Sequence, residues 1–84
     1  MKNKIRVLKV LETIHKAKST IEYKRLDLLI NTKLFNIENN EPLWGYELLN
    51  LLKEMKKEEF INQNQEQKYS ITQKGLEYLE KNTI

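Results

Sequence analysis

Four side chains have the types and the spacing that suit contact with a nucleic acid. They follow one another at intervals of 4, 3 and 4 residues and are Tyr46, Asn50, Lys53 and Lys57. On a helix that turns about 100° per residue they fall on one side, and we call them the polar stripe. In a DNA major groove, Asn can pair with adenine, Lys can reach guanine or a phosphate, and Tyr can contact a thymine methyl group or a phosphate. An ordinary solvated face of a helix has the same residue types, so both interpretations stay open.

No other arrangement of residues suggests chemistry. The chain has no cysteine, and its single histidine, His15, has no second ligand at metal-binding spacing. It also lacks a glycine-rich phosphate loop and a set of histidine, carboxylate and nucleophile. We therefore expect no catalytic residues, no metal and no cofactor.

Composition and charge favour a small basic-faced protein. The 84 residues predict one domain over 1–84, and no apolar run is free of charges, so we expect no membrane span and a cytoplasmic location. The net charge of +3 is uneven: residues 1–33 carry +6 and residues 34–68 carry −3. The basic first third is compatible with a polyanionic partner and equally with plain solubility. The excess of Lys over Arg, 13 to 2, indicates AT-rich coding in a low-GC bacterium, phage or plasmid.

The first half of the chain predicts two helices. Residues 3–17 form a broad apolar arc from Ile5 to Ile14, opposite a basic arc of Lys2, Arg6, Lys9 and Lys16. The stretch "STIE" at 19–22 matches a capping box with Ser19 as N-cap, so a second helix is expected to follow. That helix turns its apolar residues inward and Lys24 and Arg25 outward.

The second half predicts a helix, a hairpin and a final helix. The stretch "NIENNEP" is turn chemistry, and Pro42 suits a first helical position, so the third helix should open near residues 41–43 and end near Lys57. Trp44 shares a side of this helix with Leu48 and Met55, which favours core packing over intercalation. "FINQN" and "KYSIT" then predict a short hairpin, and Thr72 can cap the last helix.

The segment "YSITQKGLEYLEK" resembles the closing wing strand and last helix of small bacterial and archaeal winged helix-turn-helix regulators. The matching positions are Tyr69, Ile71, Thr72, Lys74, Gly75 and Leu79. The upstream "LLKEMKKEEFIN" is similar to the end of a recognition helix entering the wing, with Glu59 where the family usually has glycine. The resemblance covers residues 43–82 and, before them, the order of elements.

The resemblance implies a mainly α protein with a short β-hairpin wing, in the α+β class. It places the polar stripe in the major groove of double-stranded DNA. The residues expected at the DNA are Tyr46, Asn50, Lys53, Lys57, Lys24, Arg25 and Lys68. Lys2, Lys9 and Lys16, with Arg6 beside them, are either phosphate neighbours or solvated charges.

Three functions are compatible with these expectations. The first is a sequence-specific, dimeric transcriptional regulator. The second is a centromere-binding adaptor of a plasmid or phage segregation system, which recruits a filament-forming partner. The third, from another class, is a protein-interaction module with the same fold, which the −3 charge of residues 34–68 favours.

Two leucines predict a homodimer. Leu49 and Leu51 sit at opposite edges of the apolar arc of the third helix and widen it to about 160°. We expect them in a dimer interface. Alternatively, one of them packs under the segment that contains Leu34, Phe35 and Ile37.

Overall fold

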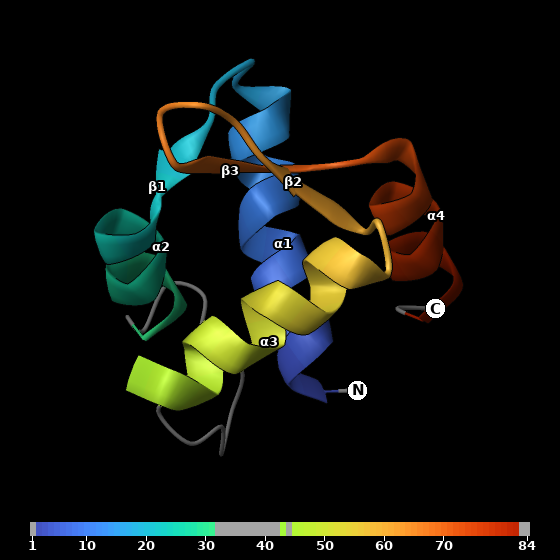
Figure 1. Ribbon diagram of the computed structural model, residues 1–84. Helices are drawn as coiled ribbons and strands as arrows, with labels where there is room; N and C mark the ends of the chain where they lie inside the picture. Colours follow the sequence, from blue (N-terminus) through green and yellow to red (C-terminus); the bar gives the residue numbers. More distant parts are fainter. Residues whose placement is uncertain (1, 32–42, 44, 83–84) are drawn as a thin grey trace.

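The computed structural model describes residues 2–31, 43 and 45–82, which form helices and a small sheet (Figure 1). In chain order the elements are α1 (Lys2–Lys16), β1 (Ile21–Glu22), α2 (Tyr23–Ile30), α3 (Gly45–Lys57), β2 (Ile61–Gln63), β3 (Lys68–Ile71) and α4 (Gln73–Asn82). The predicted α+β class, with mainly helical content, is confirmed. Among the described helices, none combines the length and the apolar character that crossing a lipid bilayer requires.

The three strands form one antiparallel sheet with β3 in the middle. Ile71 of β3 pairs with Ile61 of β2, and Tyr69 of β3 pairs with Ile21 of β1. All four side chains are buried, on the sheet face that packs against α1. The predicted hairpin is confirmed, and β1 is a third strand that the sequence analysis did not predict.

The predicted capping box at residues 19–22 is wrong. Glu22, and not Ser19, precedes α2, and its side chain makes no capping hydrogen bond. The Ser19 hydroxyl instead donates to the Thr20 carbonyl oxygen at 3.2 Å. Because Ile21 and Glu22 pair with β3, they are extended, and this strand pairing overrides the local helix signal.

Helix α1 is the centre of the hydrophobic core. It contacts β3, α2 and α4, so neighbours cover it on several sides (Figure 1). The buried arc agrees with the predicted one, and its fully buried members are Val7, Leu8, Val10 and Leu11. A helix covered on several sides needs a broad apolar arc, which is what the sequence provides.

Helices α1 and α3 are each followed, two residues after their last residue, by a non-glycine residue in the left-handed conformation. The φ angle is 56° at Lys18 and 65° at Glu59. At the end of α3 the Glu59 amide donates to the Lys56 carbonyl at 3.1 Å, and the Phe60 amide donates to the Met55 carbonyl at 3.0 Å. This is a Schellman motif, in which glycine is favoured at the Glu59 position because it has no Cβ.

The start of α4 is fixed by Thr72. Its hydroxyl donates to the Glu59 carbonyl at 2.6 Å and accepts from the Gly75 amide at 3.0 Å, which confirms the predicted cap. Its own amide donates to the Phe60 carbonyl at 3.0 Å. A Cβ at Gly75 would overlap that carbonyl oxygen and lie 2.8 Å from Cγ1 of Ile71. The close approach of α4 to Phe60 therefore requires glycine.

Asn31 ties the end of α2 to the segment before α3. Its Nδ2 donates to the carbonyl oxygens of Asp27 and Leu43, both at 2.9 Å, and its Oδ1 accepts from the Leu43 amide at 2.7 Å. One side-chain amide therefore satisfies both backbone groups of Leu43. No local pattern in the sequence indicates this role of Asn31.

The third helix begins later than predicted. Leu43 is not helical, and α3 starts at Gly45, which has a φ of 57°. The Asn31 amide holds the backbone of Leu43 in a bridge to α2, which accounts for the later start. Pro42, the expected first helical residue, and Trp44, the expected core residue, lie outside the described residues.

Candidate nucleic-acid interface

The polar stripe lies on the side of α3 that faces away from the core. The inward side of the helix is buried through Leu48, Leu52 and Met55. The residues of the stripe are all exposed, with Tyr46 reaching 84 % exposure. The structure therefore brings the four predicted residues together on one accessible surface.

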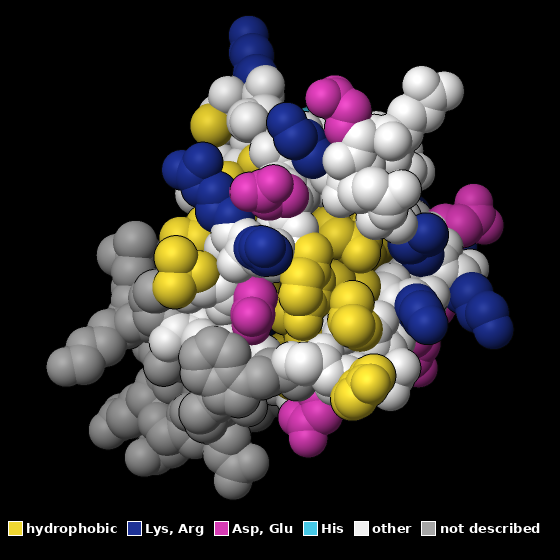
Figure 2. Space-filling model, turned by 60° about the vertical axis from the view of Figure 1, so that its left-hand side comes forward, with side chains coloured by type: hydrophobic (Ala, Val, Ile, Leu, Met, Phe, Trp, Pro, Cys, Tyr) yellow, Lys and Arg dark blue, Asp and Glu magenta, His cyan; other side chains and the backbone are white. Residues whose placement is uncertain are grey.

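The two predicted cations of α2 are also exposed. Lys24 and Arg25 point outward, while Leu26 between α2 and the core is fully buried. The start of α2 approaches the start of α3, because the Tyr23 hydroxyl donates to the Gly45 carbonyl at 3.4 Å. Figure 2 views the molecule from the α2 side and shows basic side chains on both sides of a central group of hydrophobic ones, with acidic side chains between them.

The pairing of β1 with β3 places Lys68 beside an acidic residue. Lys68 is half-buried on β3 and stands opposite Glu22 of β1 in the strand register. The Asn64 side chain accepts from the amides of Glu66 and Lys68 at 2.9 and 3.0 Å, and Gln67 takes the left-handed position with a φ of 65°. Asn64, through its hydrogen bonds, and Gln67, through its left-handed backbone, together form the turn for which a short hairpin usually uses glycine. The neighbouring Glu22 reduces the local positive charge, so Lys68 is a weaker candidate for phosphate contact than the cations of α2 and α3.

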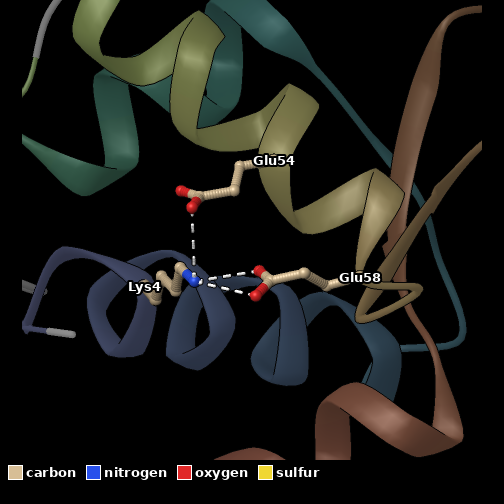
Figure 3. Close-up of polar contacts among 3 residues, drawn as sticks. All are labelled: Lys4, Glu54 and Glu58. Atoms are coloured by element: carbon tan, nitrogen blue, oxygen red, sulfur yellow. Dashed lines mark hydrogen bonds and ion pairs between the residues drawn. The ribbon is translucent and has the colours of Figure 1, made fainter.

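Two acidic residues, Glu54 in α3 and Glu58 directly after it, contact α1 through Lys4. Lys4 of α1 donates to both carboxylate oxygens of Glu58 at 2.9 and 3.1 Å, and Glu54 lies 3.8 Å from the same ammonium nitrogen (Figure 3). The hydrogen bond to Glu58 raises the pKa of Lys4 above its usual value. Lys4 was not predicted, because its partners lie about fifty residues away in the sequence and no local pattern connects them.

Arg6 does not belong to the exposed basic arc of α1. It is only 4 % exposed, and it donates to the Ile30 carbonyl at 3.4 Å and to Asn3 Oδ1 at 3.1 Å. The expectation of an outward Arg6 is wrong because α2 packs over this side of α1. Burial lowers the pKa of its guanidinium, and the contact with Ile30 places its charge at the C-terminal end of α2, where a cation is favourable. Lys9 and Lys16 are exposed as expected.

The two leucines of the predicted dimer interface lie in different surroundings. Leu51 is half-buried and packs against the core cluster, and Leu49 is half-buried on the other edge of the helix. The segment of Leu34, Phe35 and Ile37, the alternative cover for them, lies outside the described residues. The dimer stays a prediction.

Residues 2–31, 43 and 45–82 contain no group of three or more His, Cys, Asp or Glu side chains that could hold a metal ion. His15 is exposed in the last turn of α1. No protein-family model matches the chain, and no curated protein and no solved structure matches it either.

Proposed function

We propose that this chain is a winged helix-turn-helix protein that binds double-stranded DNA with α3 in the major groove. The element order supports this fold, since the β2–β3 hairpin follows α3 directly and α4 follows the hairpin. The observation on which the proposal depends is the polar stripe, whose four residues are exposed directly opposite the buried side of α3. In that position Asn50 can pair with adenine and Lys53 with guanine, while Lys24 and Arg25 can neutralise phosphates.

The cellular role that fits best is that of a sequence-specific transcriptional regulator acting as a homodimer. A segregation adaptor would use the same DNA contact and differ in recruiting a filament-forming partner. A protein-interaction module is the candidate from another class, and the row of carboxylates along one flank of α3 favours it. That row consists of Glu47, Glu54 and Glu58.

Binding to duplex DNA at increasing salt tests the proposal. Fluorescence anisotropy with labelled duplexes should give an affinity that falls with salt, with a slope of about −0.9 per neutralised phosphate on logarithmic axes. After selection of preferred sites from random duplexes, Asn50→Ala or Lys53→Ala should weaken the preferred site by about 1–3 kcal/mol and change which bases are favoured.

Lys9→Ala is the matched control, because Lys9 is exposed on α1, away from the polar stripe. It should weaken all sequences alike or have no effect. Absence of binding to any duplex at low salt would refute the DNA function and leave the interaction module as the better candidate. If Lys9→Ala relaxed the base preference while Lys53→Ala did not, α3 would not be the element that contacts the bases.

A further inference from the structure

One exposed apolar side chain on α2 stands between two cations. Leu28 is 63 % exposed, and Lys24 and Arg25 are exposed one helical turn before it. At about 100° per residue, the direction of Leu28 from the helix axis falls between the directions of Lys24 and Arg25. We call these three residues the α2 knob. A single exposed leucine is ordinary, but a leucine between two cations has a definite complement, which is an apolar depression with carboxylates at its edge.

A groove between α1 and α3 has this complementary chemistry. Its volume is about 640 Å³, and its lining includes Leu51 with Glu47 and Glu54 on the α3 side and Lys4 on the α1 side. Leu51 is half-buried and gives the groove an apolar element. Lys4 lies 2.9 Å from Glu58 and 3.8 Å from Glu54, so a single ammonium group faces the carboxylates of Glu47, Glu54 and Glu58, and the groove keeps a net negative charge.

We propose that the α2 knob of one copy of this chain docks into the α1–α3 groove of a second copy. Leu28 lies against Leu51 of the second copy, and the two cations of the knob meet Glu47 and Glu54. Apolar contact supplies the attraction, and the charges fix the orientation and exclude the pairing of two knobs or two grooves. The interface therefore joins unlike surfaces. It uses Leu51, as the sequence predicted, but not Leu49.

Each copy carries both surfaces, so this contact can link copies one after another or close a dimer through two equivalent contacts. Lys24 and Arg25 are also the α2 cations of the proposed DNA contact, and Asn50 lines the same groove. Self-association and DNA binding therefore share residues and should compete. The proposal itself does not depend on the DNA function, because it concerns the free protein.

Sedimentation velocity without DNA tests the contact. The unaltered chain should gain mass with concentration up to about 1 mM protein, the range in which weak contacts are detected. Leu28→Glu replaces the apolar side chain of the α2 knob with a carboxylate, and Glu47→Lys reverses one charge of the groove. Each variant alone should associate at least about tenfold more weakly than the unaltered chain. An equimolar mixture should form a complex, because the intact groove of the first variant accepts the intact knob of the second.

Glu80→Lys is the matched control, since it makes the same change of charge at an exposed position on α4 and should associate like the unaltered chain. Circular dichroism checks that each variant is folded, and Leu28→Gln replaces Leu28→Glu if that variant is not. The proposal is overturned if the unaltered chain stays monomeric over the whole range, if the mixture does not associate, or if Glu80→Lys is as disruptive as Glu47→Lys. Dissociation by Leu49→Glu with full association of Leu28→Glu would also overturn it, in favour of a contact through the other edge of α3.

Discussion

Replacing Glu59 with glycine should stabilise the fold, because Glu59 occupies the left-handed position at the end of α3. Its φ angle is 65°. A residue with a Cβ in this conformation is less stable by about 1–2 kcal/mol, whereas glycine adopts it freely but loses about 0.5–1 kcal/mol through the greater freedom of the unfolded chain. A carboxylate just beyond the C-terminal end of a helix adds an unfavourable contribution of about 0.3 kcal/mol. The difference is a gain of about 1 kcal/mol, within a range of about 0.3–1.8 kcal/mol.

Urea unfolding followed by circular dichroism measures this gain. The midpoint should rise with an unchanged slope, and the melting temperature should rise by about 4–8 °C per kcal/mol for a domain of this size. The hydrogen bond from the Thr72 hydroxyl to the backbone carbonyl of residue 59, at 2.6 Å, does not involve the Glu59 side chain and should persist. Thr72 therefore continues to cap α4 in the variant.

Three matched variants separate the backbone effect from other causes. Lys18→Gly and Gln67→Gly change residues with φ angles of 56° and 65° and should also stabilise. Glu80→Gly removes the same side chain as Glu59→Gly but lies inside α4, so it should destabilise by about 1 kcal/mol. A lower midpoint for Glu59→Gly together with a higher one for Lys18→Gly would refute the assignment of the strain at the end of α3.

Two further substitutions should destabilise. Gly75→Ala should reduce the free energy of unfolding by at least about 3 kcal/mol, because the new methyl group overlaps the backbone carbonyl of Phe60, and thermal unfolding measures the loss. Asn31→Asp should reduce it by about 2–4 kcal/mol at neutral pH, because a carboxylate replaces the Nδ2 that donates to Asp27 and Leu43. The oxygens around the new carboxyl group raise its folded pKa above the unfolded value, so the loss should shrink as the pH falls through that pKa, which urea unfolding at several pH values measures.

Each of these two substitutions has a matched control substitution at another position of the chain. Gly45→Ala meets no atom within 4 Å but has a φ of 57°, so it reports backbone strain alone and should cost about 1 kcal/mol. Asn82→Asp removes an exposed hydrogen bond to the Tyr78 carbonyl and should cost less than about 1 kcal/mol. Equal losses for Gly75→Ala and Gly45→Ala, or for Asn31→Asp and Asn82→Asp, would contradict the packing described here.

The helices could be predicted because their signals are local. Apolar periodicity predicts the buried sides of α1, α2 and α3, and the position of Thr72 before the last periodic segment predicts its cap. The same helical geometry predicts that the polar stripe is exposed, because residues opposite Leu48 and Met55 must point away from the core.

The parts that could not be predicted depend on contacts between distant segments. β1 is only two residues long and exists because β3 provides a partner about fifty residues later. Arg6 is buried because α2 covers it, and Asn31 bonds to Leu43 across twelve residues. The local signal at Arg6 favours an exposed basic arc, and the one at residues 19–22 favours a helix cap. Tertiary contacts determine which of these local signals is realised in the fold. Such contacts cannot be read from the pattern of a single sequence.

In the proposed complex with DNA, the acidic flank of α3 would weaken binding less than its charge suggests. Lys4 is held between Glu54 and Glu58, and its side chain is only 16 % exposed, so part of the negative charge is neutralised within the molecule. The acidic flank lies beside the polar stripe and not opposite it, because Glu54 follows Asn50 by four residues and Asn50 lines the same groove as Glu47 and Glu54. A single charge about 10 Å away contributes about 0.4 kcal/mol in water, and physiological salt reduces this further. A charge-assisted hydrogen bond from Lys53 or Lys57 to a phosphate is worth more than this repulsion. The two proposals are therefore compatible in charge, with the polar stripe of α3 suited to an anion and the acidic flank suited to the cations of a second copy.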